Sequence, residues 1–456
     1  MGVRGNLGYS ARMSKAADLT NDPIRPTLVR MTVPMMFGMI SLMLFNLADA
    51  WFVGRLGTWP LAALSFTFPI SFSLTSLAIG LGVGTSATLA RLIGRGEKQR
   101  VARLATDNLL MAVLITAVVG SVGQFLLIPI VQLMGAAEYL VPYIDSYMSV
   151  WFFAAIFMVL NMVCNSTFRA MGDTRTSAAL MLGSSLLNFI LDPILIFGWG
   201  AIPAMGIQGA AIASMIAWAI TSLLAIWVLM VRKKMIVLGV LDPSVLFENW
   251  RSVLKISLPA ALSNMMTPLA NGILTAIVAQ HGAAAVAAFG VGSRIESLAL
   301  LVCLALSMTL PPFISQNLGA KQIARVKSAY SDAVLFALSW QLLIYLLLAL
   351  GAGLLVPLFT NDSEVGRWLV LWMLIVPLGF GFQATTFLSS SSFNALHLPY
   401  HAMRVSIVRL FLFYIPLGWL GSTLFDLKGL FVGLVVANAL TALFAWFWMI
   451  KTLKRV

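Results

Sequence analysis

The chain has 456 residues, of which 60% are hydrophobic and 10% are charged. Soluble proteins carry about 25% charged residues, so this composition excludes a soluble globular protein and indicates an integral membrane protein. The formal net charge of +13 does not indicate nucleic-acid binding, because the basic residues follow the pattern of membrane topology described below. The two cysteines, Cys164 and Cys303, lie in separate apolar runs and predict neither a disulfide nor a metal site.

Long apolar runs interrupted by Gly, Pro and charged residues predict the membrane-spanning helices, each of about 20 residues or more. In chain order the predicted helices cover residues 27–53, 60–90, 104–132, 140–168, 176–198, 207–231, 251–280, 284–316, 326–357, 364–394, 401–421 and 428–451. The polar start of the chain and the length of the first apolar run argue against a cleavable signal peptide.

The basic residues predict the orientation of these helices. Most of the 29 Lys and Arg residues lie at alternate helix ends, in segments 1–30, 91–103, 169–175, 232–255, 321–327 and 451–455 and at Arg404. The positive-inside rule places these ends, and both termini, in the cytoplasm. We therefore expect a multi-pass protein of the inner or plasma membrane, with membrane lipids rather than nucleic acid around its basic residues.

The two halves of the chain resemble each other. A shift of 225 positions pairs Pro34 with Pro259, and it pairs Gly94 with Gly319. Each copy has six helices, and an even number of crossings returns the chain to the side on which it started. Both copies therefore start on the same side of the membrane, and the repeat is parallel. The predicted fold is an all-α integral membrane protein with twelve transmembrane helices in two parallel six-helix lobes, as in alternating-access carriers. Its predicted parts are a cytoplasmic N-terminal segment (1–24), an N-terminal lobe (25–231), a cytoplasmic linker (232–250), and a C-terminal lobe with a short tail (251–456).

Three acidic residues stand inside apolar segments: Asp49, Asp192 and Glu296. A charged residue at the centre of a membrane helix costs about 2.5–3.5 kcal/mol on insertion scales, so each one is a functional hypothesis. Counting from the cytoplasmic helix starts, Asp49 and Asp192 both fall in the outer half of the N-terminal lobe and could share one site. Glu296 lies near Arg294 and could instead be an ion-paired structural acid.

The fifth predicted helix carries a polar stripe. Ser184, Asn188 and Asp192 recur every four residues, which places them on one helix face, and Pro193 frees a backbone carbonyl one turn earlier. Such oxygens could bind Na⁺, or the carboxylates could hold a proton, since an apolar site favours the neutral carboxyl group. The structural alternative is a hydrogen-bonded stripe that only joins helices.

Further residues are candidates for the same site or for a substrate pocket. Asn46 shares a helix face with Asp49, Tyr147 is a candidate hydrogen-bond partner of the acids, and Pro34 should kink the first helix. Methionines on the first helix form either ordinary packing or a pocket that accepts many shapes; they are Met35, Met36, Met39 and Met43. No GxxxxGK[ST] sequence is present, so we expect no ATPase and no other enzyme activity, and transport driven by an ion gradient or by the substrate's own gradient.

The combination of these features resembles the multidrug and toxic compound extrusion (MATE) family. The resemblance rests on the duplicated six-helix units and on "NLADAWFVGRLG", "FRAMGDTRTS", "NFILDPILIFGWG", "GIQGAAIAS" and "FISQNLGAKQ". Within the family the chain resembles the DinF-like branch, which implies a cation or proton site at Asp49, Asn188 and Asp192 and a kink at Pro34. The NorM-like branch has acids on helices 7 and 10, whereas here the body of helix 10 offers only Gln383. The helix 6 threonine of the branch has only Ser214 near its position, at a different spacing.

The resemblance implies a secondary active multidrug efflux antiporter, which exports amphipathic or cationic compounds in exchange for H⁺ or Na⁺ by alternating access. Its expected partners are small-molecule drugs and membrane lipids, with no cofactor besides the coupling ion, and we expect a monomer. The alternative is a flippase for lipid-linked saccharides of the same superfamily. A diphosphate headgroup would need a cavity lined with Arg and Lys, and here only Arg294 and Arg409 interrupt the apolar spans.

Overall fold

A computed structural model describes residues 17–237 and 242–455. Within these ranges the chain is almost entirely helical, and a single β-bridge between Trp199 and Ile202 is the only strand-like pairing. Eleven helical segments of this described part are long and apolar enough to cross a membrane.

The last of these segments, Pro399–Leu453, contains two spans. Phe425 and Asp426 leave the helical conformation, and Asp426 has φ 54° and ψ −152°. The backbones of Gly421 and Gly429 meet so closely that a Cβ on either residue would overlap the other's carbonyl oxygen. Residues eight apart in a straight helix are about 12 Å apart, so the chain folds back here. With this reversal, and with α9 and α10 together forming one span, the predicted twelve-helix membrane fold is confirmed.

The helices have the following bounds, in chain order: α2 (Ile24–Gly54), α3 (Thr58–Gly94), α4 (Lys98–Leu133), η1 (Glu138–Leu140), α5 (Val141–Ala170), α6 (Thr174–Phe197), α7 (Gly206–Trp227), η2 (Val228–Arg232), α8 (Pro243–Ala279), α9 (Ala283–Ala299), α10 (Leu301–Gly319), α11 (Ile323–Phe359), α12 (Ser363–Ile375), η3 (Val376–Gly379), α13 (Phe380–Ala395), α14 (Pro399–Ile407), η4 (Val408–Tyr414) and α15 (Ile415–Leu453). Several predicted helices are not regular α-helices throughout. The helix predicted at 401–421 contains the π-helical segment η4, and the helix predicted at 207–231 ends in the π-helical segment η2. The helix predicted at 284–316 breaks at Leu300, and the helix predicted at 364–394 contains the 3₁₀ turn η3, which includes Pro377. Proline lacks the backbone N–H that a continuous helix needs.

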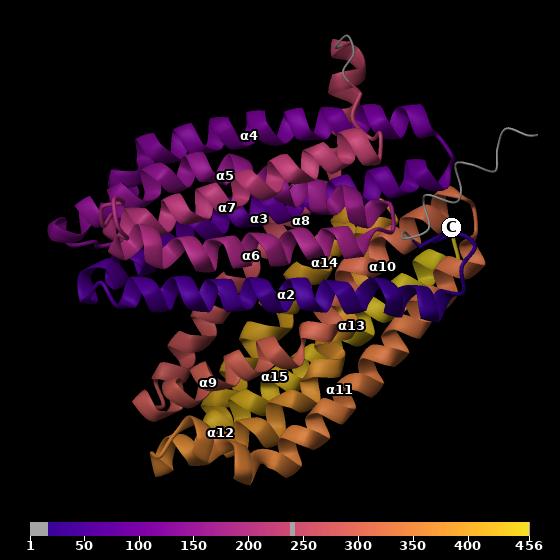
Figure 1. The fold of residues 1–456 in the computed structure, drawn as a ribbon. Helices are drawn as coiled ribbons and strands as arrows, with labels where there is room; N and C mark the ends of the chain where they lie inside the picture. Colours follow the sequence, from indigo (N-terminus) through magenta and orange to yellow (C-terminus); the bar gives the residue numbers. More distant parts are fainter. Residues whose placement is uncertain (1–16, 238–241, 456) are drawn as a thin grey trace, which may run out of the picture. The chain divides into compact units, whose positions relative to one another are not determined.

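The chain divides into two compact units. Of the described residues, unit 1 contains 17–74, 88–237, 242–250 and 315–322, and unit 2 contains 75–87, 251–314 and 323–455. In unit 1 the helices α4, α5, α7, α6 and α2 lie side by side in that order, each in contact with the next (Figure 1).

Two glycines related by the internal repeat make reciprocal contacts within unit 1. A Cβ on Gly94, at the end of α3, would overlap the Gln316 carbonyl, and a Cβ on Gly319, at the end of α10, would overlap the Arg91 carbonyl. Arg91 and Gln316 are themselves related by the same 225-residue shift. The two helix ends therefore cross at a point where both backbones need glycine.

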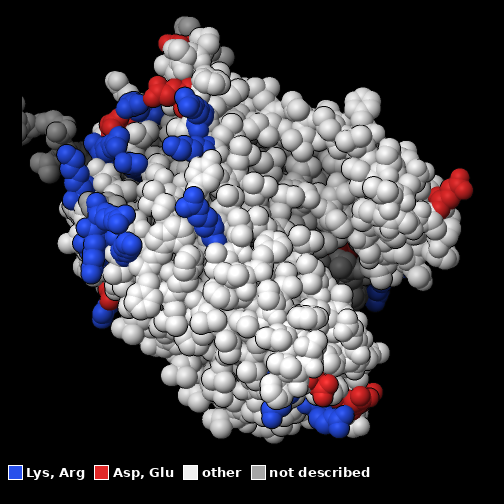
Figure 2. Space-filling model, turned by 180° about the vertical axis from the view of Figure 1, so that it is seen from behind, with Lys and Arg blue, Asp and Glu red and all other residues white. Residues whose placement is uncertain are grey.

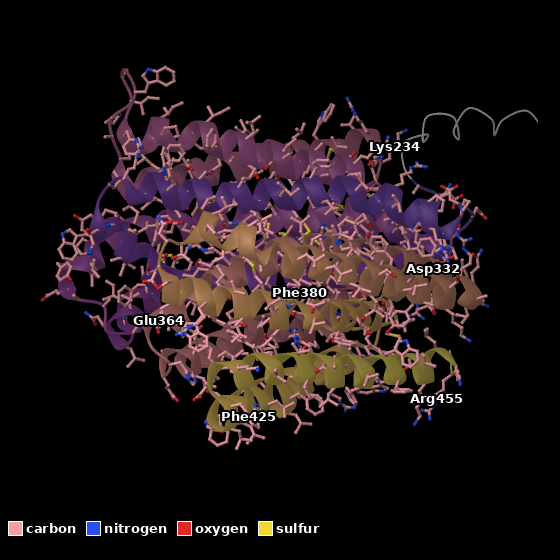
Figure 3. The ribbon with its side chains drawn as sticks, turned by 90° about the horizontal axis from the view of Figure 1, so that it is seen from below. Lys234, Asp332, Glu364, Phe380, Phe425 and Arg455 are labelled. Atoms are coloured by element: carbon pink, nitrogen blue, oxygen red, sulfur yellow. The ribbon has the colours of Figure 1, made fainter. Side chains whose placement is uncertain are left out.

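In unit 2 the helix ends fall into two groups (Figure 3). Asp332 and Arg455 lie toward one end of the unit, Glu364 and Phe425 lie toward the other, and Phe380 lies between them. This arrangement is that of a bundle whose successive helices run in opposite directions.

The linker predicted at 232–250 is shorter than expected. The helix α8 already begins at Pro243, so the second half of that linker is helical, while residues 238–241 lie outside the described part of the chain. Asp242 precedes the first turn, where hydrogen bonds from the Ser244 hydroxyl and the Ser244 N–H hold the pKa of that carboxyl below its usual value. The N-terminal segment predicted at 1–24 is described only from residue 17, and α2 begins at Ile24.

The linker is bound to α4 by buried polar contacts. The Asp107 side chain, which is fully buried, accepts hydrogen bonds from Asn249 at 2.7 Å and from Arg103 Nε at 3.2 Å. The Trp250 indole donates to the Asp107 carbonyl at 2.9 Å.

Figure 2 shows other Lys and Arg side chains gathered together and a broad surface without charge, which is the distribution expected of a membrane protein.

Candidate ion-binding site

Helices α2 and α6 pack in parallel along their length. Near the middle of α2, a Cβ on Gly38 would lie 3.1 Å from Met181 Sδ. Near the end of α2, the Phe52 ring lies 6.3 Å from the Phe197 ring. The contacts thus advance in the same direction along both helices.

This parallel packing sets the depth of the two acidic residues. The hydroxyl of Ser185 on α6 donates to Ser41 on α2 at 3.4 Å. Asp49 lies about two turns beyond Ser41, and Asp192 lies about two turns beyond Ser185. The two carboxylates therefore lie at the same depth along the parallel helices α2 and α6 of unit 1.

Both ends of α6 are fixed by local chemistry. Asp173 caps its N-terminus by accepting from the Thr176 N–H at 3.2 Å, and it also binds Lys233 Nζ at 2.6 Å. At the other end Gly198 has φ 80°, and a Cβ there would lie 2.8 Å from the Ala204 nitrogen. Pro193 lies inside the last turns and leaves the carbonyl four residues earlier without its helical donor.

The polar stripe on α6 is buried and partly hydrogen-bonded. Asn188 and Asp192 are both 0% exposed. Asn188 Nδ2 donates to Asp192 Oδ1 at 3.2 Å and to the hydroxyl of Ser214 on α7 at 3.1 Å. The structure therefore brings Ser214 to the stripe, although its position in the sequence did not match the spacing of the related family.

Three buried acceptor atoms of this cluster have no hydrogen-bond partner among the described residues. They are Asp49 Oδ1, Asn188 Oδ1 and Asp192 Oδ2. The two carboxylates also interact electrostatically with each other. Two nearby carboxylates in a poorly hydrated site cannot both stay ionised at low cost. The arrangement can therefore hold a proton on one carboxyl group, or it can offer several oxygens to one small cation.

Tyr147 is buried on α5, and its hydroxyl interacts electrostatically with Asp49 and Asp192. Tyr147 was a candidate hydrogen-bond partner of the acids, but it forms no hydrogen bond with either acid in the described structure. Asn46 is exposed, and its amide donates to the Leu42 carbonyl on its own helix at 2.8 Å. In the described structure Asn46 therefore forms no side-chain hydrogen bond with the acidic residues.

The remaining candidates of unit 1 lie on the same two helices. Ser184 is buried on α6, and Met35 is fully buried on α2, whereas Met39 and Met43 are half-buried. The helix α2 runs without interruption through Pro34. The expected kink is thus not accompanied by any break in the helix.

Glu296 belongs to unit 2. Glu296 Oε1 accepts a hydrogen bond from Gln383 Nε2 at 2.8 Å. Arg294, its neighbour in sequence, is exposed and forms no ion pair with Glu296. Glu296 is therefore not ion-paired with Arg294, which was the structural alternative for this acid, because residues two apart on a helix point to different faces.

The sequence analysis missed a buried polar network in unit 1. Asn165 Nδ2 donates to Asn161 Oδ1 at 2.6 Å, Asn161 Nδ2 donates to Thr221 on α7 at 2.8 Å, and Ser177 on α6 donates to Asn165 at 2.9 Å. The signal was present, because two asparagines four residues apart in an apolar helix share one face. This network joins α5, α6 and α7, the helices that surround the acidic stripe.

The fold and this site define a multi-pass membrane transporter built from two six-helix copies. The profile of the MatE family matches the chain twice, at residues 34–194 and 259–420, and the chain belongs to this family. The two matches begin at Pro34 and Pro259, which are paired by the internal repeat.

Individual relatives cover nearly the whole chain. A Shewanella oneidensis protein named FAD transporter is 38% identical over 94% of this chain and 95% of its own length. The multidrug export protein MepA of Staphylococcus aureus is 24% identical over 93% of both chains. Among solved structures, the Vibrio cholerae MATE transporter VcmN in the bent form has a TM-score of 0.90 and 35% identity, covering 98% of both chains.

Proposed function

We propose that this transporter is a secondary antiporter that exports amphipathic organic compounds in exchange for H⁺ or Na⁺. The observation that carries the proposal is the set of three unpaired buried oxygens on Asp49, Asn188 and Asp192. A buried carboxylate without a partner is costly, so a proton or a cation must neutralise the site for part of the transport cycle. These are also the residues that the resemblance to the DinF-like branch implies.

Coupling follows from linkage between the two ligands. A substrate that binds the neutralised and ionised forms of the lobe with different affinity changes the ion affinity by the same factor. Alternating access then converts that difference into transport. By the positive-inside rule, both termini lie in the cytoplasm and the substrate leaves the cell across its plasma or inner membrane.

The test is transport by the purified protein in proteoliposomes with an imposed pH gradient, an imposed Na⁺ gradient, or neither. Ethidium is a suitable cationic dye. We expect uphill ethidium movement with one of the two gradients and its collapse when a protonophore or Na⁺ removal dissipates that gradient. Ethidium movement that is unaffected by both gradients would contradict the coupling.

A second substrate class is favoured by one comparison. The relative named FAD transporter is 38% identical along almost the full chain, so an anionic flavin nucleotide is a second candidate substrate. Transport of FAD and of ethidium, measured in the same vesicles, distinguishes the two classes. Movement of a lipid-linked saccharide without response to either gradient would instead favour the flippase alternative.

A further inference from the structure

A second buried charged group lies in unit 2 and has no role in the coupling described above. Arg409 is 6% exposed. Its Nε atom is buried without a hydrogen-bond partner, and no described residue forms a hydrogen bond or an ion pair with its guanidinium group. A guanidinium has five N–H donors and stays protonated, so a buried one without an acceptor is costly.

The surrounding aromatic rings fix the orientation of this guanidinium. Its carbon lies 5.1 Å from the centre of the Phe387 ring and 5.4 Å from the centre of the Tyr414 ring. Arg409 and Tyr414 both lie in η4, a π-helical segment, in which residues five apart are joined by the backbone hydrogen bonds. The widened turn thereby places the Tyr414 ring beside the charge. Rings attract the cation through their faces but accept few of its hydrogen bonds.

The nearby acid does not neutralise Arg409 by direct contact. Glu296 interacts with Arg409 electrostatically, but its Oε1 atom accepts from Gln383 at 2.8 Å. Gln383 and Phe387 lie four residues apart on one face of α13, so the amide holds the carboxylate while the ring holds the guanidinium. The donors of Arg409 are consequently left for another acceptor.

We propose that Arg409 is an anion-binding residue for the transported molecule, and that it takes a phosphate or carboxylate group in a charge-assisted hydrogen bond. The inference rests on the proposed transport function, and it deepens that function by naming a substrate class, the amphipathic anion. An arginine fork matches two oxygens of one phosphate or carboxylate group. The Phe387 and Tyr414 rings keep the guanidinium in position for that group.

The sharpest probe is a pair of flavins that differ only in a phosphate group. FMN carries the phosphate and riboflavin lacks it, and their own fluorescence reports binding to the detergent-solubilised full chain. We expect the wild-type protein to bind FMN at least about tenfold more tightly than riboflavin, which is the low end of the contribution of a hydrogen bond to a charged group. Arg409→Gln should remove this preference and leave riboflavin affinity unchanged, whereas Arg409→Lys should keep part of it. Glu296→Gln should strengthen FMN binding, because it removes a like charge.

The control is Arg294→Gln, which removes an exposed arginine of the same unit, and it should leave the FMN preference intact. Thermal unfolding of each variant checks the fold. An unchanged FMN preference in Arg409→Gln, an equal loss in Arg294→Gln, or no flavin binding by the wild type would overturn the proposal. Loss of the preference when phosphatidylglycerol is added would show a site for lipid headgroups and would also overturn it. None of these outcomes affects the ethidium test of ion coupling, so the two proposals can fail separately.

Discussion

Asn188 lies one turn before Asp192 on α6, and its amide donates to Asp192 Oδ1 at 3.2 Å. The same amide also donates to Ser214, so both of its N–H groups are engaged within the lobe. Asp192 Oδ2 is left without a donor. One side of the carboxylate is thus held in place, while the other side is free to bind a proton or a cation.

Asp192→Asn and Asp49→Asn should each abolish gradient-driven efflux and leave the protein folded. An asparagine keeps the size of the side chain and can hydrogen-bond, but it cannot exchange a proton or supply a negative charge to a cation. The measurement is uphill ethidium transport in proteoliposomes. The double variant should be no worse than either single variant, because each alone removes the shared site.

Asp145→Asn is the matched control for these variants. Asp145 lies on α5 in the same unit, accepts from Gln124 at 3.3 Å and has no hydrogen bond to the acidic stripe in the described structure. It should retain coupled transport. If Asp49→Asn drives export with the wild-type dependence on pH and Na⁺, Asp49 is a structural residue.

Pro34→Ala should reduce transport while the protein still reaches the membrane. Alanine restores a backbone hydrogen bond inside α2 and removes the steric conflict of the proline ring, a change of about 3 kcal/mol in favour of the regular helix. If α2 must bend during the cycle, this stabilisation opposes the bend. Transport rate and membrane expression are measured together, with Pro129→Ala near the end of α4 as the control. Transport at the wild-type rate would show that α2 does not need this proline.

Asp107→Asn should lower the thermal stability of the protein in detergent. The fully buried carboxylate binds both Arg103 and Asn249, and breaking a buried ion pair costs about 3–5 kcal/mol. The cost here should be at the low end, because the Arg103 side chain is 20% exposed. Glu97→Gln removes the exposed pair with Arg100 and should cost less than about 1 kcal/mol. Equal shifts in the two variants would contradict this difference.

Asp426→Gly should stabilise the protein by about 1 kcal/mol, measured as a higher unfolding temperature. Asp426 has φ 54° and ψ −152°, a region of backbone space that is costly for every residue except glycine. Asp426→Ala keeps the strain and should give no gain. A gain of equal size in both variants would mean that the carboxylate, not the backbone, causes the cost.

The sequence predicted the twelve helices because hydropathy and charge determine where a chain enters and leaves a bilayer. It could not predict the break at Leu300 or the π-helical register at Arg409. The segments around both residues are mostly apolar, and hydropathy is the same whether such a segment forms a regular or an irregular helix. The polar stripe of Asn188 and Asp192 was visible from its spacing. The partner of that stripe on α7, Ser214, depends on how two helices rotate against each other, and sequence spacing does not contain that rotation.

The contacts of Asp107 have a mechanical consequence for the connection between the two units. One of the points at which the chain passes from one unit to the other lies between Trp250 and Arg251, inside the uninterrupted helix α8. The residues just before this boundary, Asn249 and Trp250, are tied to α4, so the connecting sequence offers no slack at that point. The first turns of α8 are therefore anchored to α4, and the chain continues past this anchor as one uninterrupted helix.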